Sequence, residues 1–393
     1  MGGRLFLLMM TWSVITSSAA TPVLACPFCG AVGQSLAERR DQAAVVAVGE
    51  AAGPATADAI GFLFQPFRID QRLRGHVDAA DAVDAGGPVS ARVTGPVNGT
   101  AVLFGTVAAA ALPGADRLRW SAVAADESLL GHVAAAPAVT LPAAERLRWF
   151  AARLEHPDPA IAADAFTEFG LAPFAAVSAA ADAVDQEALQ SWVSEPGIDQ
   201  RRRGLYGLLL GVVAFQTQDE SASEACNAAL HRAIETPADD FRTGFDGLLA
   251  GVLVAEGADG LEYLRQRGFL LTTARALDQR HLLSALRFAW ESLADRIPRQ
   301  QISTATATLL ASPSVAADAV VDLARYQDWN AVADVARLWD TLGGNDPLIR
   351  RAVAGYLAAC PLPVARQQLQ RLRGQDAALL QQALDAAALP AAR

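Results

Sequence analysis

The strongest constraint in this sequence is an internal repeat in its second half. The segment RRGLYGLLLGVV at 202–213 recurs as RTGFDGLLAGVL at 242–253, a spacing of 40 residues, and PAIAADAF at 159–166 recurs as PSVAADAV at 313–320. Two-helix units of about 40 residues are the period of HEAT-like arrays, in which units stack because a single one cannot bury its apolar face. The repeat therefore predicts an α-solenoid of HEAT-like helical repeats over residues 143–393.

Two further patterns support helices in this region. Apolar residues recur at helical spacing from Leu147 to Leu154, and Asp-Pro pairs at 158–159 and 346–347 resemble the helix starts of HEAT repeats. Glycine recurs every three or four residues in both copies of the 40-residue motif, although each glycine costs a helix about 1 kcal/mol. Close approach of two helices would offset that cost, and a ligand held against bare backbone is the alternative. The glycines concerned are Gly204, Gly207, Gly211, Gly244, Gly247 and Gly251.

The first half of the chain has the pattern of a small β domain. Polar and apolar residues alternate in 61–70, and short β-type segments separated by Gly, Pro, Asn and Asp follow at 89–93, 101–107, 118–123 and 129–133. Five or six short strands in about 100 residues favour a small barrel or sandwich over 26–142. Their order resembles OB-like modules of the netrin and metalloproteinase-inhibitor type, without the later cysteines of those modules. The expected fold class is α+β multidomain.

The amino terminus predicts export. Arg4 precedes an apolar run at 5–15, and small residues lead up to Cys26, which is the pattern of a secretory signal peptide over 1–25. The run is too short to span a bilayer, which takes about 20 residues. Val23-Leu-Ala-Cys26 also resembles a lipoprotein signal, so Cys26 is a candidate lipid anchor. We expect a periplasmic or secreted protein, or a membrane-anchored lipoprotein if Cys26 is lipidated.

Cys26 and Cys29 form a C-x-x-C pair at the predicted start of the mature chain. Such a pair can be a redox dithiol, half of a zinc site or a small disulfide. The sequence leaves these alternatives open, although neither a preceding strand nor further ligands at zinc-finger spacing support the first two. Cys226 and Cys360 stand alone in apolar helical segments, where we expect buried side chains.

Composition and charge exclude several functions. All 32 basic residues are arginine, so a P-loop lysine, a Schiff-base lysine and a Ser-x-x-Lys nucleophile are absent. The net charge of −10 disfavours nucleic-acid binding. Residues 143–393 carry 23 arginines against 31 carboxylates, which favours a basic protein partner. No catalytic signature, cofactor motif or metal-ligand spacing is present, and carboxylates such as Asp164 and Glu168 are expected on solvated helix faces.

Arginine and tryptophan, the residues that most often contribute binding energy at interfaces, mark the candidate binding residues. In a solenoid, equivalent helices line one concave face, so these side chains are expected to converge there. The alternative is that the aromatic residues are core and that Arg–Asp pairs join neighbouring repeats. The candidates are Arg203, Asp240, Arg242, Arg287, Trp290, Arg325 and Trp329.

Several of these motifs resemble a family of uncharacterised exported proteins from planctomycete bacteria. They are CPFC at 26–29, GLYGLLLG at 204–211, DDFR at 239–242, LRFAW at 286–290 and the stretch 323–329. The resemblance implies export and a two-part chain and brings no activity with it. The functional hypothesis is an exported, non-enzymatic binding or scaffold protein that uses its helical repeats to bind another protein. The alternative is a thiol redox or metal-handling protein acting through Cys26 and Cys29.

Overall fold

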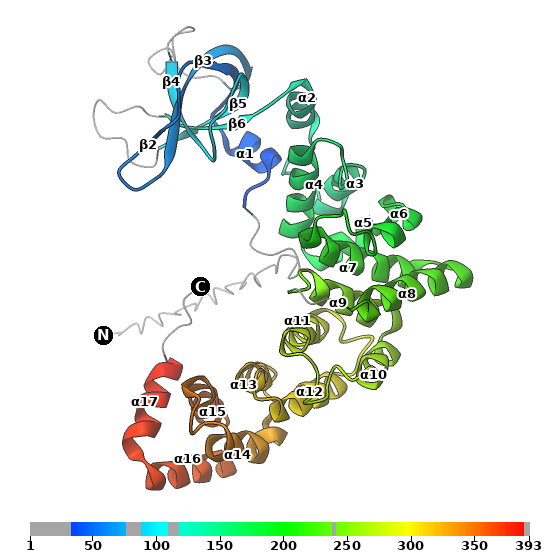
Figure 1. Cartoon of the computed structure of the whole chain (residues 1–393), viewed down its shortest axis with the longest axis vertical. Coiled ribbons are helices and arrows are strands. Elements are labelled where there is room, and N and C mark those ends of the chain that lie inside the picture. Colours follow the sequence, from blue (N-terminus) through cyan, green and yellow to red (C-terminus); the bar gives the residue numbers. More distant parts are fainter. Residues whose placement is uncertain (1–32, 76–87, 109–117, 238–240, 389–393) are drawn as a thin grey trace, which may run out of the picture.

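The computed structural model describes residues 33–75, 88–108, 118–237 and 241–388. An N-terminal β-barrel is followed by a long series of helices, so the fold is α+β. The helices follow an arc, with the barrel at one end and the last helix, α17, at the other (Figure 1). The predicted signal peptide and the Cys26–Cys29 pair lie outside the described residues.

The barrel closes through five strands. β1 pairs antiparallel with both β3 and β5, β5 pairs with β6, β4 pairs with β3, and the circle is completed by a parallel pairing of β4 with β6. This is the strand order of an OB-like barrel; β2 adds a short outer pairing to β3. The strands are β1 Val45–Ala51, β2 Thr56–Ala57, β3 Leu63–Arg74, β4 Pro88–Val93, β5 Thr100–Val107 and β6 Leu118–Ala124.

β1 is apolar on both faces because both are covered. Val45 and Ala47 point into the barrel, where they pack with Phe67 and Trp120. Val46 points outward and packs under α1 (Leu36–Gln42) and α2 (Glu127–Ala135). A strand that is buried on both faces has a continuous run of apolar residues rather than an alternating pattern. Residues 45–48 form such a run.

The segment at 129–133, expected to be a strand, lies instead in helix α2. Asp126 is the N-cap residue of this helix, and its carboxylate accepts a hydrogen bond from the Leu129 N–H. Leu129 and Val133 are both buried. Because residues four apart share a face of a helix, both side chains can reach the outer surface of the barrel, where they pack with Val46.

The helices from α7 onward form two rows. We call α7, α9, α11, α13, α15 and α17 the inner row; each contacts the next, and together they border the hollow side of the arc (Figure 1). Between them α8, α10, α12, α14 and α16 lie on the outer side. The bounds are α3 Ala143–Ala151, α4 Pro159–Leu171, α5 Phe174–Ala180, α6 Gln186–Trp192, α7 Gln200–Gln216, α8 Glu220–Glu235, α9 Phe245–Glu256, α10 Ala258–Gln266, α11 Ala276–Ser292, α12 Arg299–Thr308, α13 Ala316–Arg325, α14 Val332–Thr341, α15 Pro347–Ala359, α16 Pro363–Gln375 and α17 Ala377–Ala388.

The glycines of the repeated motif bring α7 and α9 into backbone contact. A Cβ atom at Gly211 would overlap the carbonyl oxygen of Gly251, and one at Gly247 would overlap that of Gly204, each at less than 3.0 Å. The predicted close helix–helix approach is therefore confirmed, and bare backbone at these positions faces another helix.

The junction between barrel and helices is a buried polar cluster. The Ser35 hydroxyl donates to Glu168 Oε1 at 2.5 Å, and the Leu36 N–H donates to Asp164 Oδ1 at 2.6 Å. His132 Nε2 lies 2.8 Å from Asp164 Oδ2, and Arg146 forms an ion pair with Glu168. The expectation of solvated carboxylates is wrong for Asp164 and Glu168, which are 5% and 2% exposed. The face of α4 that carries both carboxylates packs against α1 and α2. Polar groups at these two helices take the place of water as hydrogen-bond partners.

Cys226 and Cys360 are buried, as predicted, and burial raises the pKa of the Cys226 thiol.

Within the described part of the chain, no helix combines the length and the apolar character needed to cross a bilayer.

Candidate functional site

Three of the candidate binding residues meet on the inner row. Arg287 of α11 places its Nε 2.7 Å from both carboxylate oxygens of Asp322 on α13, and Arg325 Nη1 lies 3.5 Å from Asp322 Oδ1. Trp290 stacks on Tyr326, with ring centroids 4.1 Å apart and planes at 19°. We call these five residues the α11–α13 cluster.

The α11–α13 cluster is built around a carboxylate without solvent access. The side chain of Asp322 is 0% exposed. Burial raises its pKa, while the hydrogen bond and charge of Arg287 act in the opposite direction. Because these contacts join α11 to α13, the cluster stabilises the packing of neighbouring inner-row helices. Only Arg325, whose side chain is 66% exposed, presents much of its surface to solvent.

Arg242 occupies a comparable linking position one step earlier. Its Nη1 lies 3.3 Å from Asp278 Oδ2 on α11. Its Nη2 donates to the carbonyl oxygens of Ile234 and Thr236 at 2.8 and 3.2 Å, at the end of α8, and its guanidinium lies 3.4 Å from the Phe245 ring centroid. Arg242 also has a positive φ of 48°, so its backbone turns the chain sharply into α9. The neighbouring candidate, Asp240, lies outside the described residues.

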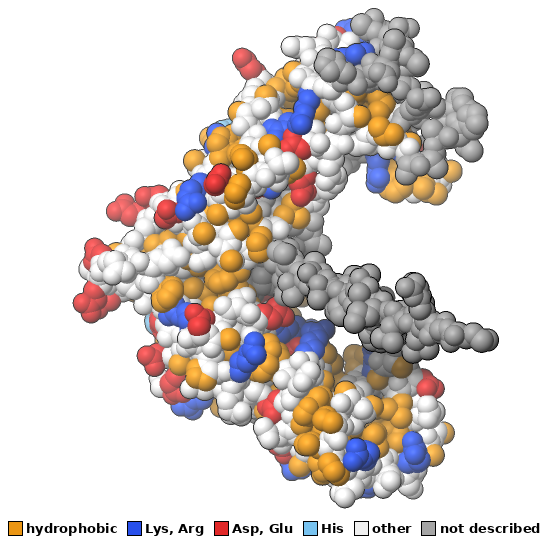
Figure 2. Space-filling view, turned by 180° about the vertical axis from the view of Figure 1, so that it is seen from behind, with side chains coloured by type: hydrophobic (Ala, Val, Ile, Leu, Met, Phe, Trp, Pro, Cys, Tyr) orange, Lys and Arg blue, Asp and Glu red, His pale blue; other side chains and the backbone are white. Residues whose placement is uncertain are grey.

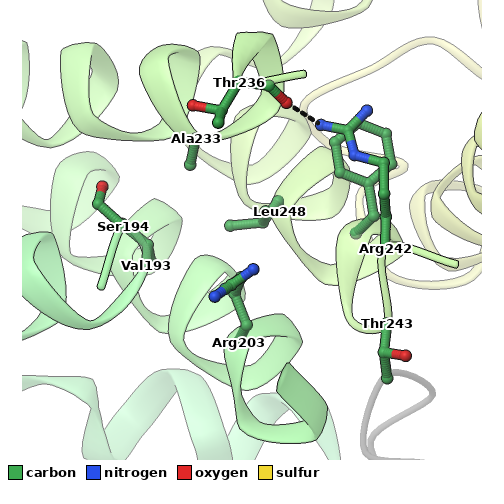
Figure 3. Close-up of a pocket in the computed structure, with 9 residues that line it drawn as sticks. Val193, Ser194, Arg203, Ala233, Thr236, Arg242, Thr243 and Leu248 are labelled. Atoms are coloured by element: carbon green, nitrogen blue, oxygen red, sulfur yellow. Dashed lines mark hydrogen bonds between the residues drawn. The ribbon is translucent and has the colours of Figure 1, made fainter. Parts of the chain in front are cut away.

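Trp329 and Arg203 lie away from the α11–α13 cluster. Trp329 begins a short 3-10 helix after α13 and packs edge-on against Tyr356 of α15, with centroids 5.1 Å apart. Arg203 lies on α7 and lines a small cavity opposite Arg242 (Figure 3). The structure thus brings together Arg287, Trp290 and Arg325, places Arg203 and Arg242 around a second position, and leaves Trp329 between α13 and α15.

A groove that the sequence analysis missed lies beside the α11–α13 cluster. It has a volume of about 580 Å³ and runs between α13, α15 and α17; we call it the α13–α17 groove. Its wall is apolar, with Val321 40% and Leu348 62% exposed, and its charged residues are Asp318, Arg325 and Arg351. Seen from behind, the end of the arc formed by the last helices carries hydrophobic side chains with arginines among them (Figure 2).

The excess of carboxylates in the helical part does not lie on the inner row. Its six helices contain eight arginines and seven carboxylates. The excess of carboxylates, on which the expectation of a basic partner rests, therefore lies outside the inner-row helices.

The described residues hold no group of three or more His, Cys, Asp or Glu side chains placed to bind a metal ion. Cys26 and Cys29, the residues of the thiol hypothesis, are outside that part of the chain.

Comparison with known proteins gives no match, either to a family model or to a curated protein sequence.

Proposed function

We propose that this chain is an exported, non-enzymatic scaffold protein whose helices form a HEAT-like solenoid, and that it binds a segment of another protein in the α13–α17 groove. The solenoid interpretation is supported by the 40-residue repeat and by the sequential contacts of the inner row. It is also supported by Asp158 and Asp346, whose carboxylates cap α4 and α15 directly before a proline.

The observation that carries the binding proposal is the exposure of Leu348 and Val321 on facing helices. Apolar side chains that line a concave groove mark protein-binding or ligand-binding surfaces, whereas single exposed ones need no explanation. Val321 belongs to α13 and Leu348 to α15, and both line the same groove. A helical or extended segment with one or two large apolar residues would cover them.

The charges of the groove favour an acidic partner segment. Arg325 and Arg351 line it against the single carboxylate of Asp318. Within the described residues Arg351 has no ion-pair partner, and Arg325 meets only the already paired Asp322 at 3.5 Å. Carboxylates next to the apolar anchor would satisfy both guanidinium groups. The partner we propose is therefore an apolar segment flanked by Asp or Glu, in place of the basic partner that net charge alone favours.

The test is selection of peptides from a displayed random library on the purified chain, followed by affinity measurement with the selected peptides. We expect peptides with an apolar anchor and flanking carboxylates, and a loss of affinity of about tenfold or more on Leu348→Asp. Leu271→Asp is the matched control, because Leu271 is 59% exposed but lies outside the groove. Arg351→Glu should shift the selection toward basic peptides.

The proposal fails if selection yields no peptides, or if the affinity of those selected is unchanged by Leu348→Asp. Cys29→Ser should leave peptide affinity unchanged; a loss with this variant would favour the thiol alternative. An intact mass of the mature protein tests export and lipidation of Cys26, because cleavage after residue 25 and an added acyl chain each change it by a defined amount.

A further inference from the structure

The cavity between Arg203 and Arg242 is separate from the α13–α17 groove. It lies where the loop after α6, the start of α7, the end of α8 and the start of α9 meet, and its volume is about 90 Å³ (Figure 3). Its polar lining consists of the two arginines and the residues Ser194, Thr236 and Thr243. We propose that this cavity, the Arg203 pocket, is a binding site for a small oxyanion, a phosphate, sulfate or carboxylate group.

Arg203 differs from the two arginines that precede it. Arg201 pairs with Asp199 at 2.7 Å, and Arg202 pairs with Glu155 at 3.1 Å. Among the described residues, no carboxylate lies within ion-pair distance of Arg203. Its Nε is buried without a hydrogen-bond partner, and its Nη2 makes one long bond of 3.4 Å to the Glu195 carbonyl oxygen.

A buried donor without an acceptor is costly, more so when it is charged. The Nε and Nη2 atoms form the edge of the guanidinium that binds two oxygens of one oxyanion side by side. An oxyanion in the Arg203 pocket would therefore supply the acceptors that the protein itself does not provide to Nε.

Arg242 forms the opposite wall rather than a second free donor. Its guanidinium is already bound to Asp278 and to the end of α8. The start of α9 also borders the cavity: its N-cap residue is Gly244, which offers no side-chain acceptor, and Thr243, Phe245 and Leu248 line the cavity, whereas Asp246, the carboxylate of the first turn, is not a lining residue. The first turn of a helix carries a partial positive charge that favours an anion.

The size of the pocket limits the ligand. A space of about 90 Å³ holds several water-sized groups, enough for an inorganic oxyanion or for the terminal carboxylate or phosphate of a larger molecule. Ser194 lines the cavity and is exposed to solvent, so such a group can enter along this residue.

The experiment is calorimetric titration of the full chain with sodium phosphate, sulfate, acetate and chloride at constant ionic strength, combined with thermal unfolding. We expect saturable binding and a rise in Tm with at least one oxyanion and not with chloride. Comparing the tetrahedral anions with acetate distinguishes a phosphate or sulfate ligand from a carboxylate. Arg203→Gln should weaken the affinity about tenfold or more.

Arg201→Gln is the matched control. It removes the same charge from an exposed side chain two residues earlier in the chain, and this variant should keep the oxyanion affinity. Without ligand, Arg203→Gln should have an equal or higher Tm than the natural chain, whereas a merely structural arginine would lower Tm when replaced. Ser194→Asp, which adds a carboxylate at the rim, should abolish oxyanion binding. Equal responses to all four anions, or undiminished binding by the Arg203→Gln variant, would overturn the proposal.

Discussion

Gly211 and Gly251 occupy equivalent positions in the two copies of the repeated motif, and they lie against each other across the interface of α7 and α9. A Cβ atom at either position would overlap a backbone carbonyl oxygen of the facing helix, that of Gly251 for Gly211 and that of Gly207 for Gly251. The repeat that identifies the array in the sequence is thus also the contact surface between two of its helices.

Gly251→Ala should destabilise the fold by about 1–3 kcal/mol, because the methyl group forces α7 and α9 apart. This loss exceeds the gain of about 1 kcal/mol that alanine brings to a helix. Gly131→Ala on α2 is the control: nothing lies within 4 Å of its added Cβ, so only the gain should appear. Urea unfolding of both variants measures the two effects, and equal shifts would contradict the close approach.

Asp322→Ala should cost about 3 kcal/mol of unfolding free energy, since it removes the buried acceptor of Arg287 and the link between α11 and α13. Asp334→Ala is the control. Its carboxylate pairs with Arg337 at 2.9 Å, but the two side chains are 59% and 66% exposed, and such pairs contribute about 1 kcal/mol or less. Chemical denaturation compares the two; a small effect at Asp322 would show that the α11–α13 cluster does not hold the helices together.

Gln327→Gly should stabilise the protein by about 0.5–1 kcal/mol. Gln327 has a φ of 55°, and it follows α13 at the position where glycine is preferred: its N–H donates to Ala324 and that of Asp328 to Leu323. Glycine adopts this left-handed conformation without the cost that a Cβ atom imposes. Gln370→Gly, at an exposed position inside α16, should instead lose about 1 kcal/mol. A lower Tm for Gln327→Gly would contradict the assignment.

The stabilising effect of Asp41 should disappear in acid. Burial by itself raises the pKa of this carboxyl, but hydrogen bonds from Arg40, the Val139 N–H and Arg74 outweigh it and lower the pKa to about 2. A carboxyl in an unfolded chain has a pKa of about 3.9. The contribution of Asp41 is therefore complete above about pH 5 and is lost as the pH falls through 4 toward 2.

The measurement is the difference in unfolding free energy between the natural chain and Asp41→Asn from pH 7 to 2.5. This difference in unfolding free energy should be constant near pH 7 and should decrease as the pH falls below 4. Asp70→Asn removes a carboxylate that is 41% exposed and pairs with Arg68; its difference should stay within about 1 kcal/mol throughout. A difference for Asp41 that is as large at pH 2.5 as at pH 7 would contradict the assignment.

The sequence predicted the elements that depend on local pattern. The 40-residue repeat, the β-type segments of the barrel and the helix starts at Asp158 and Asp346 are visible because each follows from spacing or from a cap. The burial of Asp164 and Glu168 could not be predicted, since it depends on α1 and α2 covering that face of α4. Likewise, alternation alone does not show that the segment at 129–133 is a helix lying on the barrel.

The candidate site was predictable in part for the same reason. The convergence of three candidates follows from the repeat, because Arg325 lies about one repeat after Arg287 and Trp290. The sequence also held a signal for the two carboxylates: the pairs Arg242–Asp278 and Arg287–Asp322 have similar spacings, of 36 and 35 residues. The exposed residues Val321 and Leu348 carry no such signal. Which apolar side chain of a helix stays uncovered is decided by where its neighbours pack.

The bond between Ser35 and Glu168 spans 133 residues of sequence, and this distance orders the folding of the chain during synthesis. A chain emerges from the ribosome amino terminus first, so the strands of the barrel are available long before α4. Helix α1 precedes all the described strands, yet the Ser35 hydroxyl and the Leu36 N–H acquire their acceptors only when Asp164 and Glu168 have emerged. Among the described helices α1 is therefore the first to be synthesised, and its packing on the barrel can form before its bonds to α4 complete its anchoring.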